Sequence, residues 1–150
     1  MNMTCVNKQY QKSLLNTYTN TSQTITTSGN IRFDNVNVLD GCSIDFNAGT
    51  TSITLDKAGV YFITMDATVS DAGTPGAVSF QINKNGASIN GATAKVVTTA
   101  STDVYALSAS TIVKVLPSCC STDNTTIVTV SNTGLSAIYT NANLTVVKLC

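Results

Sequence analysis

The residues of this chain that could do chemistry are eight acidic side chains, all Asp, and five cysteines; His and Glu are absent. Without an imidazole, neither a Ser-His-Asp triad nor a Cys-His pair can form, and the HExxH zinc motif is excluded. Two Asp carboxylates could still cleave a glycosidic bond. The candidates near expected strands are Asp40, Asp45 and Asp66. Ordinary solvated side chains explain all three more simply. The sequence therefore predicts no catalytic residue and a protein that is not an enzyme.

Cofactor and metal sites have little support in the sequence. No glycine-rich phosphate or dinucleotide motif is present, so no cofactor is expected. Calcium prefers oxygen ligands, and expected loops carry Asp71, Asp103, Asp123 and Asn124. These residues lack the regular spacing of a dedicated calcium loop. Charged loop residues are the simpler interpretation, and no metal site is predicted.

The cysteines stand at positions 5, 42, 119, 120 and 150, an odd number without CxxC spacing. A secreted disulfide framework normally has an even number. A bond between the adjacent Cys119 and Cys120 would be strained. We therefore expect free thiols in a reducing compartment. An alternative hypothesis is that Cys150 forms a bond between chains in an oxidising medium.

Composition points to a single β domain. The chain has 150 residues, including 25 Thr, 15 Ser and 15 Asn, which favour strands and turns. Eight basic residues balance eight acidic ones, so neither nucleic acid nor an anionic membrane is an expected partner. No run approaches the roughly 20 apolar residues of a membrane span, and no secretory signal is apparent. We expect a soluble protein made in the cytoplasm.

Alternating apolar residues predict a series of short antiparallel strands from residue 29 onward. Val78, Phe80 and Ile82 alternate before Asn85-Gly86, a strong hairpin signal. A longer strand is expected from about Val104 to Leu116. The pattern favours about eight to ten strands in a sandwich or barrel.

The first 28 residues look different, being polar and Thr-rich without sustained alternation. We interpret residues 1–28 as an N-terminal arm that orders on a partner, and residues 29–150 as the head domain. The apolar anchors expected in the arm are Tyr10, Leu14, Leu15 and Tyr18. A frayed terminus or a first edge strand is an equally simple alternative.

Two segments carry a resemblance to a known family. Residues 52–69 read SITLDKAGVYFITMDATV and residues 142–149 read ANLTVVKL. They resemble the Gly-x-Tyr strand and the closing strand of the complement C1q and tumour-necrosis-factor-like jelly roll. The resemblance covers residues 30–149 and is strongest to the microbial and bacteriophage branch. It implies an all-β antiparallel jelly-roll sandwich, usually a homotrimer. The family's Gly-Asp turn is replaced here by Pro117-Ser118-Cys119-Cys120, which weakens any transfer of loop function.

The strands of these two segments have apolar residues on both faces. Val60 and Phe62 lie opposite the face of Tyr61, and Val147 lies opposite Val146. A two-layer sandwich buries only one face of each strand, so the second face needs a cover. A symmetric subunit interface would supply it, as would loops or the arm of the same chain. The expected residues of the trimer interface are Tyr61, Ile63, Val147 and Leu149.

The favoured hypothesis is a structural virion protein, a trimeric capsid decoration or head-fibre protein. It would be located on the capsid surface and attached to the major capsid protein or another virion protein through its N-terminal arm. The alternative is a receptor-binding or lectin-like head that recognises cell-surface glycans, which hydroxyl- and amide-rich loops would suit.

Overall fold

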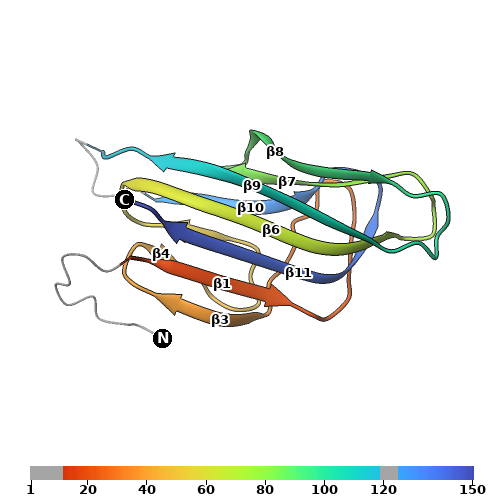
Figure 1. Ribbon diagram of the computed structural model, residues 1–150, viewed down its shortest axis with the longest axis horizontal. Helices are drawn as coiled ribbons and strands as arrows, with labels where there is room; N and C mark the ends of the chain where they lie inside the picture. Colours follow the sequence, from red (N-terminus) through yellow and green to blue (C-terminus); the bar gives the residue numbers. More distant parts are fainter. Residues whose placement is uncertain (1–11, 119–124) are drawn as a thin grey trace.

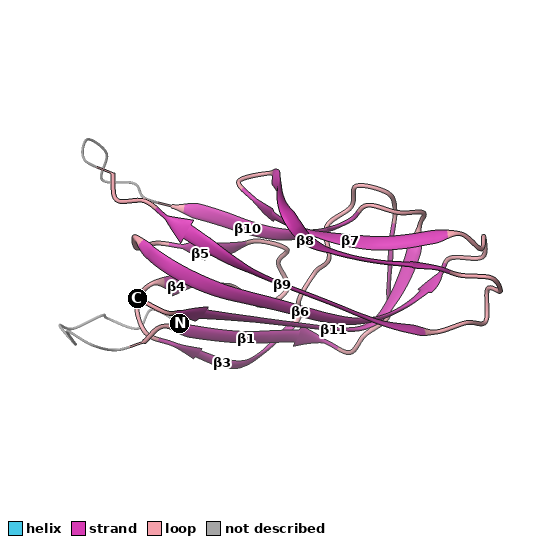
Figure 2. Cartoon of the chain, turned by 45° about the horizontal axis from the view of Figure 1, so that its top comes forward, coloured by secondary structure: helices cyan, strands magenta, loops and turns pink. Residues whose placement is uncertain are grey.

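The protein is a sandwich of two antiparallel sheets. The computed structural model describes residues 12–118 and 125–150. Figures 1 and 2 show the two layers and the long central strands. This architecture confirms the all-β antiparallel sandwich. No helix long and apolar enough to cross a membrane occurs among the described residues.

The first sheet has the order β3-β1-β11-β6-β9, and β2 pairs with the far end of β11. Its strands are β1 (Leu14–Thr19), β2 (Gln23–Ile25), β3 (Asn35–Asp40), β6 (Gly59–Asp71), β9 (Tyr105–Val115) and β11 (Ala137–Lys148). The second sheet has the order β4-β5-β10-β7-β8. Its strands are β4 (Ile44–Asp45), β5 (Ile53–Leu55), β7 (Ala77–Lys84), β8 (Ala87–Val97) and β10 (Thr126–Asn132).

The core lies between the two sheets and follows the period of two that strands impose. On β6 the buried side chains alternate from Tyr61 to Val69. They pack against buried residues of the opposite sheet, which include Phe80 and Val130. The Asn85-Gly86 turn joins β7 to β8, and both residues have positive φ angles, 49° and 78°. The predicted hairpin is therefore confirmed.

The Gly-x-Tyr segment has a clear physical basis. A side chain at Gly59 would collide with the backbone carbonyl of Cys150, so only glycine lets the C-terminus lie against the start of β6. Two residues later, the buried Tyr61 hydroxyl donates a hydrogen bond of 2.6 Å to the carbonyl of Lys57. The motif thus closes the turn before β6 and fixes the chain end beside it.

The prediction of a separate arm over residues 1–28 is wrong for residues 14–25. Strand β1 pairs with both β3 and β11, and β2 pairs with β11, so this segment belongs to the sheet of the head. Leu15, an expected anchor, is fully buried in the core and cannot bind a partner. Leu14 and Tyr18 lie on the outer face of the same strand. Tyr10 lies outside the described residues.

Hydrogen bonds explain how so polar a segment becomes an inner strand. The buried hydroxyl of Thr17 donates to the carbonyl of Asn35 at 2.6 Å, and that of Thr19 donates to the Asp34 carboxylate at 2.9 Å. Each buried polar group is therefore paired, which removes most of the cost of burying it. The apolar pattern of the segment is weak because hydroxyl groups occupy core-facing positions.

The free-thiol prediction is wrong for Cys42, which is disulfide-bonded. Cys150 is free and exposed at the C-terminus. The other three cysteines, at positions 5, 119 and 120, lie outside the described residues. The interpretation of a reducing compartment loses its support.

Replacing Leu15 by Ala should destabilise the whole domain, because β1 lies inside a sheet and its side chain is fully buried. We expect the free energy of unfolding in urea to fall by about 2–5 kcal/mol, the usual range for a buried leucine. The exposed Asn20→Ala variant is the matched control and should change it by less than about 0.5 kcal/mol. A Leu15→Ala variant as stable as the wild type would show that β1 is a dispensable arm.

Two core tyrosines make stability depend on alkaline pH. Burial raises the pKa of the Tyr139 hydroxyl far above its ordinary value, and burial likewise raises the pKa of Tyr61. The Tyr139 hydroxyl also donates a hydrogen bond of 3.0 Å to the Asn132 side chain. Above the ordinary tyrosine pKa of about 10 the unfolded chain loses these protons while the folded chain keeps them.

We therefore expect ionisation of these two tyrosines to leave the free energy of unfolding unchanged below about pH 10 and to lower it as the pH rises further. Urea denaturation at a series of pH values from 8 to 11 measures the slope. The Tyr139→Phe variant starts less stable, because it loses a hydrogen bond, but should show a shallower fall. An identical slope in both proteins would contradict the assignment.

Candidate interaction face

The outer face of the first sheet carries a row of partly exposed apolar side chains and, next to it, a group of polar side chains. It is formed by the side chains of β1, β11, β6 and β9 that point away from the core. The register of these strands fixes which residues lie side by side across it. Two zones follow one another along the strands, an apolar row and a polar hollow.

The apolar row consists of Leu14, Val147, Phe62 and Ile112, one from each of four neighbouring strands. Leu14 is directly opposite Val147, Val147 is opposite Phe62, and Phe62 is opposite Ile112. The first three side chains are half-buried, and that of Ile112 is 61% exposed. No described segment of the chain pairs with this face beyond the sheet itself. The row is therefore a partly covered apolar stripe that is most exposed at Ile112.

The prediction is wrong for two of the four expected interface residues. Tyr61 and Ile63 are fully buried between the sheets, so they stabilise the chain itself and cannot contact another subunit. Val147 lies in the apolar row, and Leu149, just beyond β11, is 50% exposed. Phe62 was missed as an interface candidate, although its position opposite the Tyr61 face was visible in the alternation. The sequence shows two apolar faces on β6 but does not say which one faces the core.

Amides and hydroxyls occupy the next part of the face. The Asn16 side chain donates to the side chains of Asn143 at 2.9 Å and Thr145 at 2.8 Å. The Asn37 side chain donates to that of Asn16 at 2.6 Å. This network crosses β3, β1 and β11 and holds the Asn143 carbonyl oxygen in place. The amide nitrogen of Asn143 is left without a hydrogen-bond partner among the described residues.

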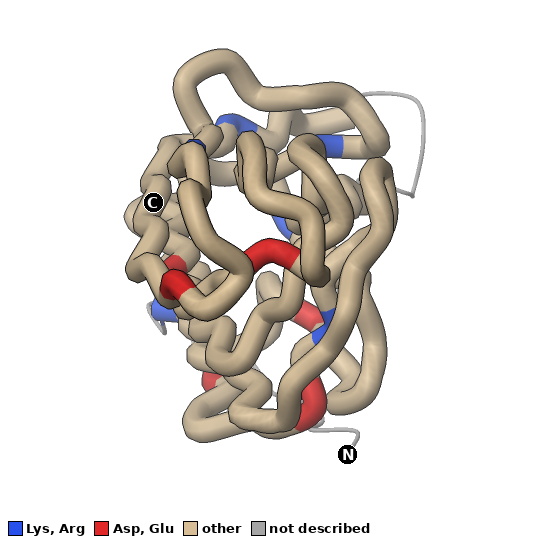
Figure 3. The backbone as a smooth tube through the Cα atoms, turned by 90° about the vertical axis from the view of Figure 1, so that its right-hand side faces the viewer, with Lys and Arg blue, Asp and Glu red and all other residues tan. Residues whose placement is uncertain are grey.

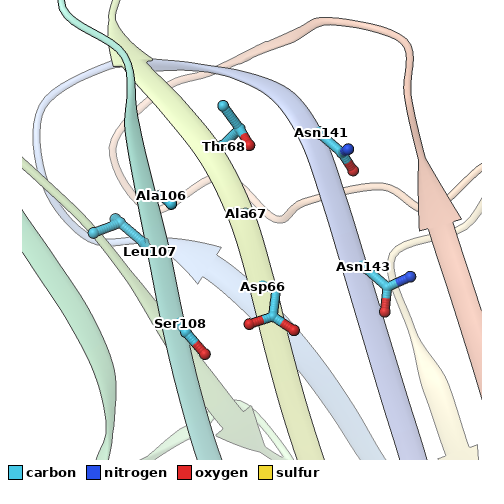
Figure 4. A pocket seen from close by; sticks show the side chains of 8 residues that line it. All are labelled: Asp66, Ala67, Thr68, Ala106, Leu107, Ser108, Asn141 and Asn143. Atoms are coloured by element: carbon cyan, nitrogen blue, oxygen red, sulfur yellow. The ribbon is translucent and has the colours of Figure 1, made fainter.

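The polar hollow, shown in Figure 4, lies beside this network and has a volume of about 250 Å³. Asp66 on β6 is at its centre, directly opposite Asn143 on one side and Ser108 on the other. The rest of the lining consists of Ala67, Thr68, Ala106, Leu107 and Asn141. None of the side chains of Asp66, Thr68, Ser108 and Asn141 has a hydrogen-bond partner within the described ranges. Asp66, Ser108 and Asn141 are exposed, so their polar atoms face solvent.

The other acidic candidates do not form a common site. Asp40 is on β3, where its carboxylate accepts the amide of Gly41 at 2.8 Å, and Asp45 is exposed on the opposite sheet. Figure 3 shows that acidic and basic positions are scattered over the molecule. Asp40, Asp45 and Asp66, the residues considered for glycoside hydrolysis, lie on three different strands, namely β3, β4 and β6.

The loop residues considered for calcium are engaged within the chain. Oδ1 of the buried Asp71 accepts the amide of Gly73 at 3.0 Å, whereas its buried Oδ2 has no hydrogen-bond partner among the described residues. Asp103 accepts hydrogen bonds from the hydroxyls of Tyr105 and Thr99, both at 3.1 Å, and these bonds hold the pKa of Asp103 below its usual value. Across residues 12–118 and 125–150, no three Asp, Glu, His or Cys side chains gather as metal ligands do. Asp123 and Asn124 lie outside those ranges.

Comparison with known proteins identifies the fold. No protein-family model and no curated sequence matches the chain. Among solved structures it is similar to the globular domain of zebrafish complement 1qA, with a TM-score of 0.69, 11% identity, and coverage of 92% of this chain and 98% of that one.

Murine APRIL at pH 5.0 gives a TM-score of 0.68 at 11% identity, covering 93% of this chain and all of that one. The PRD1 vertex protein P5 gives a TM-score of 0.55 at 18% identity, covering 92% of this chain and 97% of that one. Such similarity over almost the full length of each chain shows a shared fold. The protein has the jelly-roll fold of the C1q and tumour-necrosis-factor-like domains.

Proposed function

We propose that this chain is a non-enzymatic structural protein of a virion, a capsid decoration or head-fibre protein that works as a homotrimer. The observation that carries the proposal is the apolar row of Leu14, Val147, Phe62 and Ile112 on the outer face of the first sheet. An apolar stripe that spans four strands needs a cover. The resemblance to C1q and tumour-necrosis-factor-like trimers suggests that two further copies of the chain provide it.

The energetics support self-association through this row. Burying a large aliphatic or aromatic side chain contributes roughly 1.5–3 kcal/mol. Three copies would each bury several such side chains, and this gain opposes the entropy lost on assembly. The exposed Ile112 is at the edge strand β9, where a neighbouring copy can reach it without opening the sheet.

The virion role has weaker support, namely the shared fold with a PRD1 vertex protein and the resemblance to phage heads. The lack of any His or Glu supports a binding role over a catalytic one. The segment of residues 14–25 cannot act as a free attachment arm, because it forms strands of the sheet. Attachment through residues 1–11 stays a prediction.

The oligomeric state is tested by light scattering on a sizing column. The wild type should have three times the chain mass of 15.6 kDa. Ile112→Asp places three charges in the interface and should give a monomer that keeps its β-rich circular dichroism spectrum. Ile127→Asp is the matched control, because Ile127 is 42% exposed on the opposite sheet, and it should remain a trimer. A monomeric wild type would overturn the trimer.

The location is tested with antibodies raised against the purified chain. Immunogold electron microscopy of virus particles made by cells that carry the gene should show label on the capsid surface. Label that stays in the soluble fraction, with unlabelled particles, would contradict the virion role while leaving the trimer untouched.

A further inference from the structure

We propose that Asn90 is a site of spontaneous deamidation, at which the side-chain amide is converted to aspartate or isoaspartate. The chain contains the dipeptide Asn-Gly twice, at Asn85-Gly86 and at Asn90-Gly91. Glycine after asparagine leaves the backbone nitrogen unhindered, because it has no Cβ. The two dipeptides therefore share the same intrinsic chemistry, and their structural surroundings decide which one reacts. Asn90 is on β8 of the second sheet, so its modification goes beyond the role proposed for the first sheet.

The reaction uses water as its only co-reactant. The backbone nitrogen of Gly91 attacks Cγ of Asn90 and closes a succinimide ring. The side-chain nitrogen leaves as ammonia and takes with it the proton of the Gly91 amide. Water then opens the ring at either carbonyl, which gives aspartate or isoaspartate. The attack requires that the Asn90 side chain can turn toward the following nitrogen and that the backbone leaves room for the ring.

Asn85 is held in a position that opposes this reaction. Its side-chain Oδ1 accepts the amide of Ile127 at 2.8 Å, and its own amide donates to the carbonyl of Ile127, also at 2.8 Å. Both bonds join the hairpin turn to β10. Attack of Gly86 on Cγ would require the first bond to break, so the reaction at Asn85 has to wait for a local opening of the turn.

Asn90 has no such restraint. It is exposed, and its side chain has no hydrogen-bond partner in the part of the chain that the structure describes. The register of β7 and β8 shifts between Gln81 and Asn83, and residues 89–92 of β8 have no partner on β7. Such a bulge leaves residues outside the hydrogen-bonded ladder. Because β8 is also the last strand of its sheet, no strand of that sheet pairs with Asn90 from the other side.

The two ends of the bulge are fixed, which confines its freedom to the tip. The carbonyl of Ile89 accepts a hydrogen bond of 2.7 Å from the Gln81 side chain, and Ala92 is fully buried in the core. Between them, Gly91 has a φ angle of 80°, and no atom lies within 4 Å of the place where its Cβ would stand. The surroundings of the Asn90-Gly91 peptide therefore leave room for the succinimide ring.

The product differs from the original chain in charge rather than in fold. Deamidation adds one negative charge to a chain whose formal net charge is zero. Isoaspartate also adds a methylene group to the main chain, which would shift the register of a paired strand. The bulge residues are not paired, so they can take up this change. We expect the protein to become a mixture of two charge forms as it ages.

The test compares the two sites within one peptide. The folded full-length chain is incubated in mildly alkaline buffer, and samples are then cleaved after lysine. Lys84 and Lys95 bound a peptide of residues 85–95 that carries both asparagines. Fragment masses report the gain of about 1 Da at each site. In the folded chain Asn90 should convert at least about tenfold faster than Asn85, because only Asn85 needs a local opening. In the chain unfolded by urea the two rates should agree within about twofold.

Two variants are the controls, followed by isoelectric focusing. Asn90→Gln has a longer side chain that closes a ring far more slowly, so it should not develop the acidic band that the wild type acquires. Asn90→Asp should run with that band from the start. An acidic band that appears equally fast in Asn90→Gln would contradict the assignment of the site.

Three results of the peptide comparison would overturn the proposal: equal conversion of both sites in the folded chain, faster conversion of Asn85, or no conversion of Asn90 while the unfolded chain reacts. The sizing-column mass of the same samples tests the trimer separately. A monomer that deamidates at Asn90 would refute the trimer alone, and a trimer that stays unmodified would refute the deamidation site alone.

Discussion

The pairing of β11 with both β1 and β6 is the constraint on which the rest of the structure depends. This strand joins the N-terminal segment to the central strand over nearly its whole length. Because side chains alternate across a strand, one register decides two surfaces. It directs Leu144 and Val146 into the core and aligns Val147 with Leu14 and Phe62 outside. A shift of one residue would exchange the two sets.

The outer face of the first sheet has two zones of different chemical character. At one end, an apolar row gains free energy by leaving water, which favours contact with a similar surface. In the middle, hydroxyl, amide and carboxylate groups form specific hydrogen bonds but gain little from burial unless each is paired. The face is thus suited to assembly and recognition.

The polar segments of the chain are structural as well as exposed. Thr17 and Thr19 are buried in β1 through hydrogen bonds to Asn35 and Asp34. Asn132 donates to the carbonyls of Ile25 and Leu135 and accepts from Tyr139, which ties β2 to the end of the sandwich. A chain rich in Thr and Asn can therefore build inner strands, provided that each buried group finds a partner.

The sequence by itself determined the fold class, since the alternation of Val78, Phe80 and Ile82, the Asn85-Gly86 hairpin and a Thr-rich composition are all local signals. The Gly-x-Tyr segment likewise indicated the jelly roll. Only the tertiary structure decided that residues 14–25 are strands of the head, because their core-facing threonines look polar until partners from other strands pair them. It also decided that Phe62 rather than Tyr61 faces outward, and that Asp66, Ser108 and Asn143 share one row. Such placements depend on register between distant strands, and a local pattern carries no information about register.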